Sequence, residues 1–387
     1  MTERLYYTDS YLRQFSARVL DRSEDGLTVY LDRTAFYPTS GGQPFDTGTI
    51  AGIPVVEVTD DGERIAHRTS APLHTGPVDC AIDWDRRWDH MQQHTGQHLL
   101  SAVFHDLFDL RTVSFHLGQE SCTIDLEGGT LEPRTVIEAE LHANQIVCQN
   151  REVGVVFEDA EAVSGLRKAS DREGTLRIVT IADFDRSACG GTHVHRTGEI
   201  GPILIRKLEK VRNSVRVEFL CGLRAVRRAR ADFDALSRAA QSYCSPLDEV
   251  PDLVASHLES ERAADKVRRK LELELAGYQG RELYENTAAD AEGMRRVLKR
   301  VGSGSMDDIR AIAQSFTAQG KALFLGVIEN PPSLLLAASA ESAVDAGKLV
   351  KAAVTEAGGR GGGSARAAQG SVPTAAALES MIRKLGW

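Results

Sequence analysis

Residues 90–104 of this 387-residue chain read HMQQHTGQHLLSAVF, and this stretch decides how the middle of the protein folds. Between residues 86 and 109 the large apolar residues fall mostly on one helical face, which predicts a buried amphipathic helix. His94 and His98 lie four residues apart on it, so their side chains project about 40° from each other around the helix axis. That spacing allows two imidazoles to bind one metal ion.

A second group of metal-binding residues follows in CGGTH, residues 189–193. The two glycines allow Cys189 and His193 to bend back onto one ion, and the soft thiolate favours zinc. With His94 and His98 they complete a tetrahedral set, so the sequence predicts one zinc ion per chain. Four protein ligands are typical of structural zinc, whereas catalytic zinc keeps one position open, and the pattern alone leaves both uses open.

Two neighbouring residues limit what this helix can do. Thr95 occupies the position at which zinc proteases carry a general-base glutamate beside the first histidine, and this excludes protease chemistry of that type. His90 lies one turn before His94, but three ligands from one straight helix would diverge by about 80°. We therefore assign His90 to packing or to support of the ligands.

A glycine-containing motif stands near the N-terminus, where residues 34–48 read TAFYPTSGGQPFDTG. The pattern predicts a strand that ends in a turn, and Gly41 and Gly42 would allow a ligand to approach the backbone closely. The side chains that could hydrogen-bond a polar substrate are Gln43 and the hydroxyls of Thr34, Thr39 and Ser40. An ordinary polar turn is the alternative interpretation.

The pattern outside these motifs predicts an α+β protein. Residues 1–85 contain short segments rich in Val, Leu and Thr, separated by Gly and Asp turns, which favour a small N-terminal β-barrel. In residues 86–222, helices packed on a mainly antiparallel sheet are expected. The expected segments there are a second helix at 135–149 and strands at 121–126, 152–157, 175–181, 201–210 and 214–220.

The remaining sequence is expected to form two further parts. Residues 223–300 are charged and helical in pattern, with an apolar stripe at Leu258, Val267, Leu271 and Leu275, which indicates a helical connector. Residues 301–387 predict a small, glycine-rich C-terminal α/β domain. Its expected segments are strands at 323–328 and 333–338, helices at 343–357 and 374–385, and a glycine run at 358–363.

The composition limits the function classes. The chain has 46 basic and 55 acidic residues, a net charge of −9, which argues against a general nucleic-acid-binding surface. Residues 1–223 hold 34 acidic and 23 basic residues, whereas residues 224–387 hold 21 and 23, so a polyanion would be held locally or by the second part. No apolar run approaches the roughly 20 residues of a membrane span, and the N-terminus lacks a secretory signal. We expect a cytoplasmic protein without membrane association.

Several motifs, taken in order, resemble one family. TAFYPTSGGQPFDTG, HMQQHTGQHLLSAVF, SFHLGQESCTIDL, CGGTHVHRTGEIG and VRVEFLCGLRA are similar to the editing domain of alanyl-tRNA synthetase, and more closely to the freestanding AlaX-type editing proteins. The resemblance covers residues 5–225. The tail EAGGRGGGSARAAQGS resembles the glycine-rich end of the DHH-associated domain, although SARAAQGS departs from its usual continuation. The sequence begins directly at the editing region, which favours a trans-acting editor over a synthetase.

The resemblance implies a zinc-dependent, ATP-independent hydrolase that removes serine, or glycine, from wrongly charged tRNA-Ala and has no aminoacylation activity. His94, His98, Cys189 and His193 would be the metal ligands at the catalytic site. Serine differs from alanine by one hydroxyl, and a site whose polar groups need that hydroxyl can reject alanine by roughly 10⁴ or more. On this interpretation Thr34 is the first candidate for the hydroxyl contact and Gln43 the second, with Gly41 and Gly42 beside the substrate.

The tRNA would be held by basic residues, for which the candidates are Arg224, Arg227, Arg228 and Arg360. The resemblance also suggests a homodimer formed through the C-terminal half. Two other functions remain open at this point: a tRNA-binding module with structural zinc, and a zinc-dependent hydrolase of another ester. Whether zinc activates water or anchors the substrate is also left open.

Overall fold

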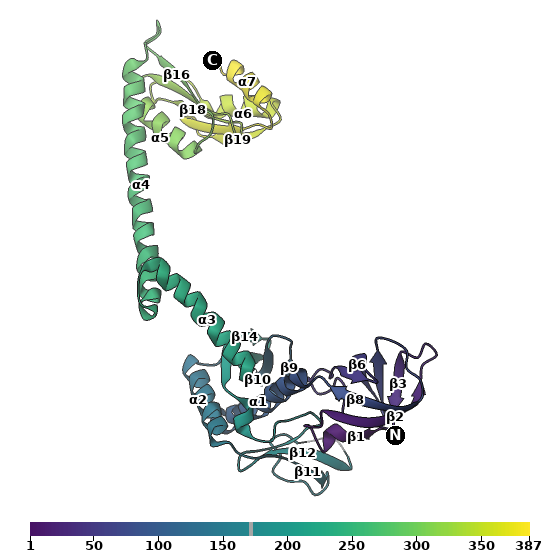
Figure 1. The fold of residues 1–387 in the computed structure, drawn as a ribbon. Coiled ribbons are helices and arrows are strands. Elements are labelled where there is room, and N and C mark those ends of the chain that lie inside the picture. The colour runs from purple at the N-terminus through teal and green to yellow at the C-terminus, as the bar shows by residue number, and fades with distance from the viewer. Residues whose placement is uncertain (170–172) are drawn as a thin grey trace. The chain divides into compact units, whose positions relative to one another are not determined.

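The computed structural model describes residues 1–169 and 173–387, which divide into two compact units, Met1–Ala239 and Ala240–Trp387. Helices and sheets build both units, in agreement with the predicted α+β class (Figure 1). The described residues form seven α-helices, and none of these is long and apolar enough to cross a membrane.

Six antiparallel strands near the N-terminus close into a barrel in the order β2-β3-β7-β6-β5-β8. Alternate side chains point inward, as in β7, where Ile65, His67 and Thr69 are buried. A short parallel pair, β1 (Glu3–Arg4) with β4 (Arg33–Thr34), lies outside the closed set. The barrel strands are β2 (Gln14–Arg22), β3 (Thr28–Leu31), β5 (Gly48–Ile50), β6 (Ile53–Asp61), β7 (Arg64–Thr69) and β8 (Gly76–Ile82).

The rest of the first unit packs helices against antiparallel sheets, as the sequence predicts. A four-stranded sheet has the order β14-β15-β10-β9, and a three-stranded sheet has the order β11-β12-β13. Helix α2 (Pro133–Gln149) contributes Ala139, Ala143 and Ile146 to the shared apolar core. The strands are β9 (Thr112–Leu117), β10 (Cys122–Glu127), β11 (Val153–Asp159), β12 (Thr175–Ile181), β13 (Asp185–Ala188), β14 (Ile203–Val211) and β15 (Ser214–Cys221).

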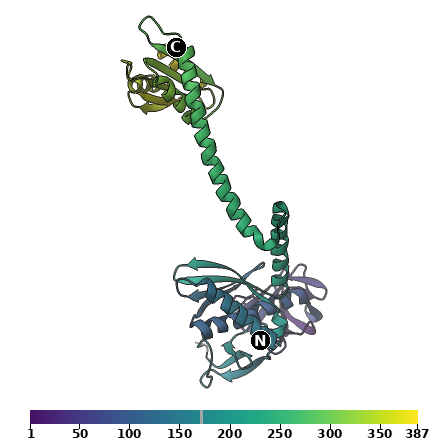
Figure 2. The ribbon, with the colours of Figure 1, turned by 90° about the vertical axis from the view of Figure 1, so that its left-hand side faces the viewer.

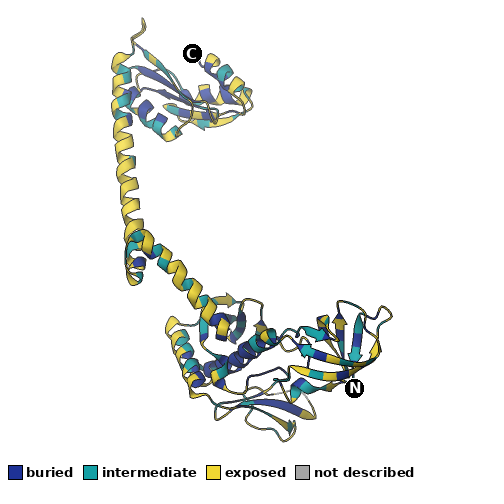
Figure 3. Ribbon diagram, in the orientation of Figure 1, coloured by how far each residue is buried: buried dark blue, intermediate teal, exposed yellow. Residues whose placement is uncertain are grey.

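Helix α1 (Trp84–Phe108) runs through the middle of the first unit. It begins where the Asp83 side chain accepts a hydrogen bond from the backbone N–H of Arg86. Every residue from His90 to Phe104 is buried (Figure 3). The helix is therefore buried on all its faces, whereas the sequence predicts burial of one apolar face only. The polar side chains on the other faces find partners, as where Gln93 donates to the backbone carbonyl of Cys221 and accepts from its N–H. The helix therefore carries its histidines into a fixed, enclosed position.

The glycine motif is held between α1 and β9. The side chains of Asp46 and Arg87 are fully buried and form an ion pair, and Arg87 also donates to the carbonyl of Ser10. On the other side, Gly42 accepts a hydrogen bond from the backbone N–H of Leu117. A Cβ on Gly42 would lie 2.6 Å from the carbonyl oxygen of Phe115, and its φ of +84° also favours glycine. Glycine is needed here for packing against β9.

The second unit contains a long helix and a five-stranded sheet in the order β16-β17-β18-β20-β19. Figures 1 and 2 show α4 as one continuous helix. The predicted stripe residues on it, Leu258, Val267, Leu271 and Leu275, are all exposed. The preceding helix, α3 (Gly222–Tyr243), runs across the division between the units. The other elements are α4 (Val250–Asn286), β16 (Arg295–Val301), α5 (Met306–Thr317), β17 (Ala322–Ile328), β18 (Ser333–Ala338), α6 (Ala346–Glu356), β19 (Arg360–Gly363), β20 (Ala367–Ser371) and α7 (Ala375–Lys384).

Two features of this unit differ from the expectation. The connector does not stay helical to residue 300, because β16 already joins the sheet at Arg295 and pairs in parallel with β17. Within the glycine run, residues Arg360–Gly363 form strand β19, which pairs with β20, whereas Gly358 lies in a turn. A Cβ on Gly363 would lie 2.3 Å from the carbonyl oxygen of Ala367, so glycine permits the close approach of β19 to β20. Glycine has a low β-propensity, and the run therefore does not predict a strand.

Candidate metal centre and substrate pocket

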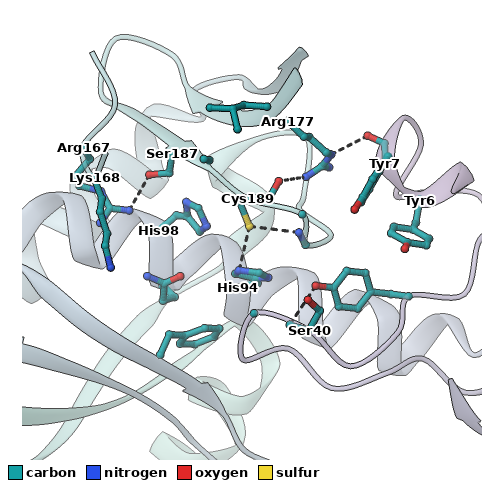
Figure 4. Close-up of a pocket in the computed structure, with 18 of the residues that line it drawn as sticks. Tyr6, Tyr7, Ser40, His94, His98, Arg167, Lys168, Arg177, Ser187 and Cys189 are labelled. Carbon is teal, nitrogen blue, oxygen red and sulfur yellow. Dashed lines mark hydrogen bonds between the residues drawn. The ribbon is translucent and has the colours of Figure 1, made fainter. Parts of the chain in front are cut away.

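The four predicted ligands come together although they are distant in sequence. His94 and His98 extend from α1, and Cys189 lies in the turn that follows β13 (Figure 4). His193 follows in the same turn. One ligand atom from each lies within 4.8 Å of the others, and the group is largely buried. His90 is buried one turn earlier on the helix and is not part of this group.

Two sulfur–nitrogen distances within the group match those around a tetrahedral zinc ion. Zinc–sulfur bonds of about 2.3 Å and zinc–nitrogen bonds of about 2.0–2.1 Å place sulfur and nitrogen about 3.6 Å apart. The Sγ atom of Cys189 lies 3.5 Å from Nε2 of His94 and 3.4 Å from Nε2 of His193. A thiolate with imidazole nitrogens is also a donor set that suits zinc. The residues present therefore fit the metal that the sequence predicts.

The electrostatics of the group favour metal binding at its sulfur. Burial disfavours the Cys189 thiolate, but the surrounding histidines outweigh it and hold the pKa of this thiol well below its usual value. The pKa of His98 shifts upward instead. Burial would lower it, but the Cys189 thiolate and the Asp185 carboxylate outweigh burial and raise it to about 9. Burial lowers the pKa of His193 to about 3, so this ring is neutral. The thiolate is the form of Cys189 that binds metal, whereas His98 would release its proton on binding the ion.

Gln43 supports a ligand and does not face the pocket. Its Oε1 lies 2.8 Å from Nδ1 of His94 and accepts from the backbone N–H of Thr192, while its Nε2 donates to the Thr192 hydroxyl. The side chain is fully buried. A hydrogen bond at Nδ1 fixes the ring so that Nε2 points to the metal position. These contacts give Gln43 a role in positioning the His94 ring.

The other two histidines also meet a polar group at Nδ1. The Thr95 hydroxyl oxygen lies 3.1 Å from Nδ1 of His193, and it donates its own proton to the carbonyl of Met91. The Asp185 carboxylate lies 3.7 Å from Nδ1 of His98. That carboxylate is held in turn by Arg167 and by the Ser187 hydroxyl. Sequence spacing did not reveal the contacts of Thr95 with His193 and of Asp185 with His98, since each joins segments far apart in the chain.

A pocket of about 700 Å³ opens onto the metal centre (Figure 4). Gly41 lies in its wall, and no atom lies within 4 Å of the place where a Cβ would stand. On another side, Thr112 of β9 and Gln97 of α1 line it beside His98. The Thr112 hydroxyl donates to Oγ of Ser101, which also accepts from Nε2 of Gln97. The sequence analysis missed Gln97 and Thr112, because neither belongs to a metal-binding or glycine-rich pattern.

Thr34 does not lie in this pocket. Its side chain is fully buried in β4, where the hydroxyl is 2.8 Å from Nε2 of His67 and accepts from the backbone N–H of Phe36. Burial lowers the pKa of His67 to about 4, so the imidazole is neutral and can accept the Thr34 proton. The structure therefore gives the Thr34 hydroxyl partners inside the barrel and leaves it outside the pocket lining.

The arginines proposed for tRNA differ in their surroundings. Arg224 is buried and makes paired hydrogen bonds to the Asp89 carboxylate, so it ties α3 to α1 and is not available to a phosphate. Arg228 pairs with Asp232 one helical turn later. Arg227 is exposed on α3, and Arg360 is exposed at the start of β19. Arg227 and Arg360 are accessible and have no carboxylate partner among the ion pairs of the described residues, whereas Arg228 is accessible but paired.

Known proteins resemble both units of the chain. Residues 176–217 match the family described as threonyl and alanyl tRNA synthetase second additional domain, and residues 295–386 match the DHHA1 domain. The alanyl-tRNA editing protein AlaX-L of Pyrococcus horikoshii is 33% identical over 96% of this chain and 95% of its own length. The alanyl-tRNA editing protein Aarsd1 of Bos taurus is 36% identical over 57% of this chain and 54% of its own. An alanine–tRNA ligase of Pyrococcus furiosus is 31% identical over 99% of this chain, which spans 43% of the ligase.

Proposed function

This chain belongs to the alanyl-tRNA editing proteins, and we propose that it hydrolyses the ester between tRNA-Ala and a wrong amino acid, serine or glycine. The observation that carries the proposal is the group of His94, His98, Cys189 and His193 at the pocket, in a chain that matches an editing protein over nearly its whole length. The proposed catalytic part is residues 86–222, with the glycine motif of the first 85 residues forming one pocket wall.

The chain's own residues position the reacting groups. An aminoacyl ester is already activated, so a hydrolase need only orient it, position water and stabilise the developing charge. Gln43 and Thr95 fix the imidazoles of His94 and His193, so that both Nε2 atoms converge on the sulfur of Cys189. When bound to these ligands, zinc would supply Lewis acidity beside the ester.

Recognition of serine is assigned to Thr112 and Gln97. Both line the pocket beside the ligand His98, and both bond to the buried Ser101 hydroxyl, which fixes their orientation. The Thr112 oxygen uses its proton in that bond and keeps lone pairs that can accept the proton of a substrate hydroxyl. The alanyl side chain has no hydroxyl, so an alanyl ester would leave the polar groups of the pocket without a hydrogen-bond partner, and this raises the free energy of its transition state.

Thr112→Val tests this assignment. The variant should hydrolyse Ser-tRNA-Ala about tenfold to a hundredfold more slowly in kcat/KM, because one hydrogen bond to the substrate hydroxyl is lost. Gly-tRNA-Ala has no side-chain hydroxyl, so its hydrolysis should stay near the wild-type rate. The measurement is the release of each labelled amino acid from tRNA under single-turnover conditions.

Thr34→Val is the matched control, since it removes a threonine hydroxyl of the same chemistry that is bonded inside the fold. It should lower stability but retain Ser-tRNA-Ala hydrolysis at any temperature where it stays folded. Equal loss of serine and glycine release in Thr112→Val would contradict a contact to the hydroxyl. A selective loss of serine release in Thr34→Val would restore the original assignment.

We propose that tRNA is held partly by the second unit. Arg360 is exposed there, the charge of residues 224–387 is less acidic than that of residues 1–223, and residues 295–386 match the DHHA1 domain. The exposed leucines of α4 support the second unit as the place where two copies would associate. The proposed tRNA contact and the proposed association of two copies concern binding partners only, and the proposed chemistry at the metal centre does not depend on them.

A further inference from the structure

Arg177 of β12 occupies an unusual position in the pocket wall. Its side chain is about nine-tenths buried, and two of its nitrogens are held by backbone carbonyls. Nε donates to the carbonyl of Tyr7 at 2.9 Å, and Nη1 donates to the carbonyl of Cys189 at 2.6 Å (Figure 4). The guanidinium is therefore fixed directly beside the turn that carries the metal-binding sulfur.

This cation has no carboxylate partner in the parts of the chain that the structure describes. The other two arginines in the pocket wall do have one, because Arg4 pairs with Asp60 and Arg167 pairs with Asp185. A buried cation that lacks a carboxylate partner is costly to a fold, so its presence in a pocket indicates a ligand that supplies the anion.

The remaining nitrogen, Nη2, makes no hydrogen bond to a described residue. We propose that Arg177 binds the phosphodiester that joins the terminal nucleoside of the tRNA to the nucleotide before it. This proposal rests on the proposed function, in which the ester on the terminal ribose lies at the metal centre. The phosphate on that same ribose is then the anion nearest to the ester, and guanidinium groups bind phosphate oxygens with strong, directed hydrogen bonds.

A purely structural role predicts different behaviour. If Arg177 only ties Tyr7 to the Cys189 turn, its loss should disturb the metal centre and slow hydrolysis of every ester equally. If it binds phosphate, the effect should depend on the charge of the linkage in the substrate. The two roles are separable by changing the substrate and not only the protein.

Three small esters allow this comparison. The first is 3′-O-seryl adenosine, which has no phosphate. The second carries a cytidine joined to the same adenosine by a phosphodiester, and the third has a neutral methylphosphonate in place of that phosphodiester. Wild-type protein loaded with zinc should show kcat/KM about tenfold or more higher for the phosphodiester than for the methylphosphonate, and this preference should fall as salt is raised.

Arg177→Gln should reduce the preference for the phosphodiester to about one while keeping hydrolysis of seryl adenosine and the zinc content. Arg4→Gln is the matched control, since that guanidinium lies in the same wall but is already paired with Asp60. It should keep the wild-type preference. The comparison of phosphodiester with methylphosphonate in the wild type decides the question even where Arg177→Gln does not fold.

The outcomes separate the inference from the proposed function. Equal kcat/KM for the charged and neutral linkages in the wild type would overturn the phosphate contact and leave the hydrolase intact. An equal loss on all three esters in Arg177→Gln would assign the residue to structure alone. Failure of the wild type to hydrolyse seryl-tRNA-Ala itself would overturn the proposed function and this inference with it.

Discussion

Gly191→Ala is expected to lose zinc and, with it, ester hydrolysis. A Cβ at this position would lie 2.2 Å from Cε1 and 2.4 Å from Nδ1 of the His94 ring, and 3.0 Å from Oε1 of Gln43. These atoms cannot simply move aside, because Gln43 holds the ring by a hydrogen bond at Nδ1 and Nε2 faces the Cys189 sulfur. The new methyl group would displace either the ring or the turn that carries Cys189.

The measurement is the zinc content of purified protein, for which less than one-tenth of the wild-type amount is predicted. Gly190→Ala is the matched control, since its nearest neighbour would be the Tyr7 hydroxyl at 3.7 Å, an ordinary contact distance. That variant should retain its zinc. A full zinc content in Gly191→Ala would show that the turn and the His94 ring are not held as described.

Asp46→Ala should cost about 3–5 kcal/mol of folding free energy, because it leaves the Arg87 guanidinium buried without its carboxylate. Both side chains are fully buried, and Asp46 also accepts from the backbone N–H of Tyr37. The pair joins the glycine motif to α1, so its loss affects the two segments that meet at the metal centre. Urea unfolding of the zinc-loaded protein, followed by circular dichroism, measures the change.

Asp60→Ala provides the comparison, since it removes a carboxylate from an ion pair of similar chemistry that is partly exposed to solvent. The side chains of Arg4 and Asp60 are 22% and 33% exposed, so water can replace the lost partner. A loss of no more than about 1 kcal/mol is expected there. Similar losses in the two variants would contradict the importance of burial at Asp46.

The metal ligands could be predicted because their signal is local. His94 with His98, and Cys189 with His193, each show the spacing of two ligands within one segment, and the need for four ligands joins the two segments. The groups that support the ligands carry no such spacing. Thr95 touches His193 and Asp185 approaches His98 only because the fold brings α1 against the end of β13.

The Thr34 and Arg224 assignments share one origin, because a sequence does not show whether a polar group is already bonded within the fold. Thr34 has a hydroxyl close in sequence to the glycine motif, but the barrel supplies His67 as its partner. Arg224 stands in a run of basic residues that suggests a phosphate site, but Asp89 on α1 neutralises it. The folded structure is needed to distinguish Thr34 and Arg224 from Arg177. The Nε and Nη1 atoms of Arg177 donate to backbone carbonyls, and no carboxylate of a described residue pairs with its charge.

The broad architecture was easier to predict from the sequence than the short strands. Long segments with clear periodicity, such as α1 and β12, were expected close to their observed bounds. The two-residue strand β1 and the glycine-rich strand β19 were not expected, because their residues have low β-propensity and pair only through tertiary contacts.

The most direct test of the central claim is deacylation of Ser-tRNA-Ala, Gly-tRNA-Ala and Ala-tRNA-Ala by zinc-loaded wild type and by Cys189→Ala. The wild type should release serine, and glycine where it is accepted, while sparing alanine, and Cys189→Ala should lose both zinc and activity because the sulfur ligand is gone. Full activity in Cys189→Ala would contradict the metal centre, and equal release of all three amino acids would contradict the discrimination. No release by the wild type would instead support a tRNA-binding module with structural zinc.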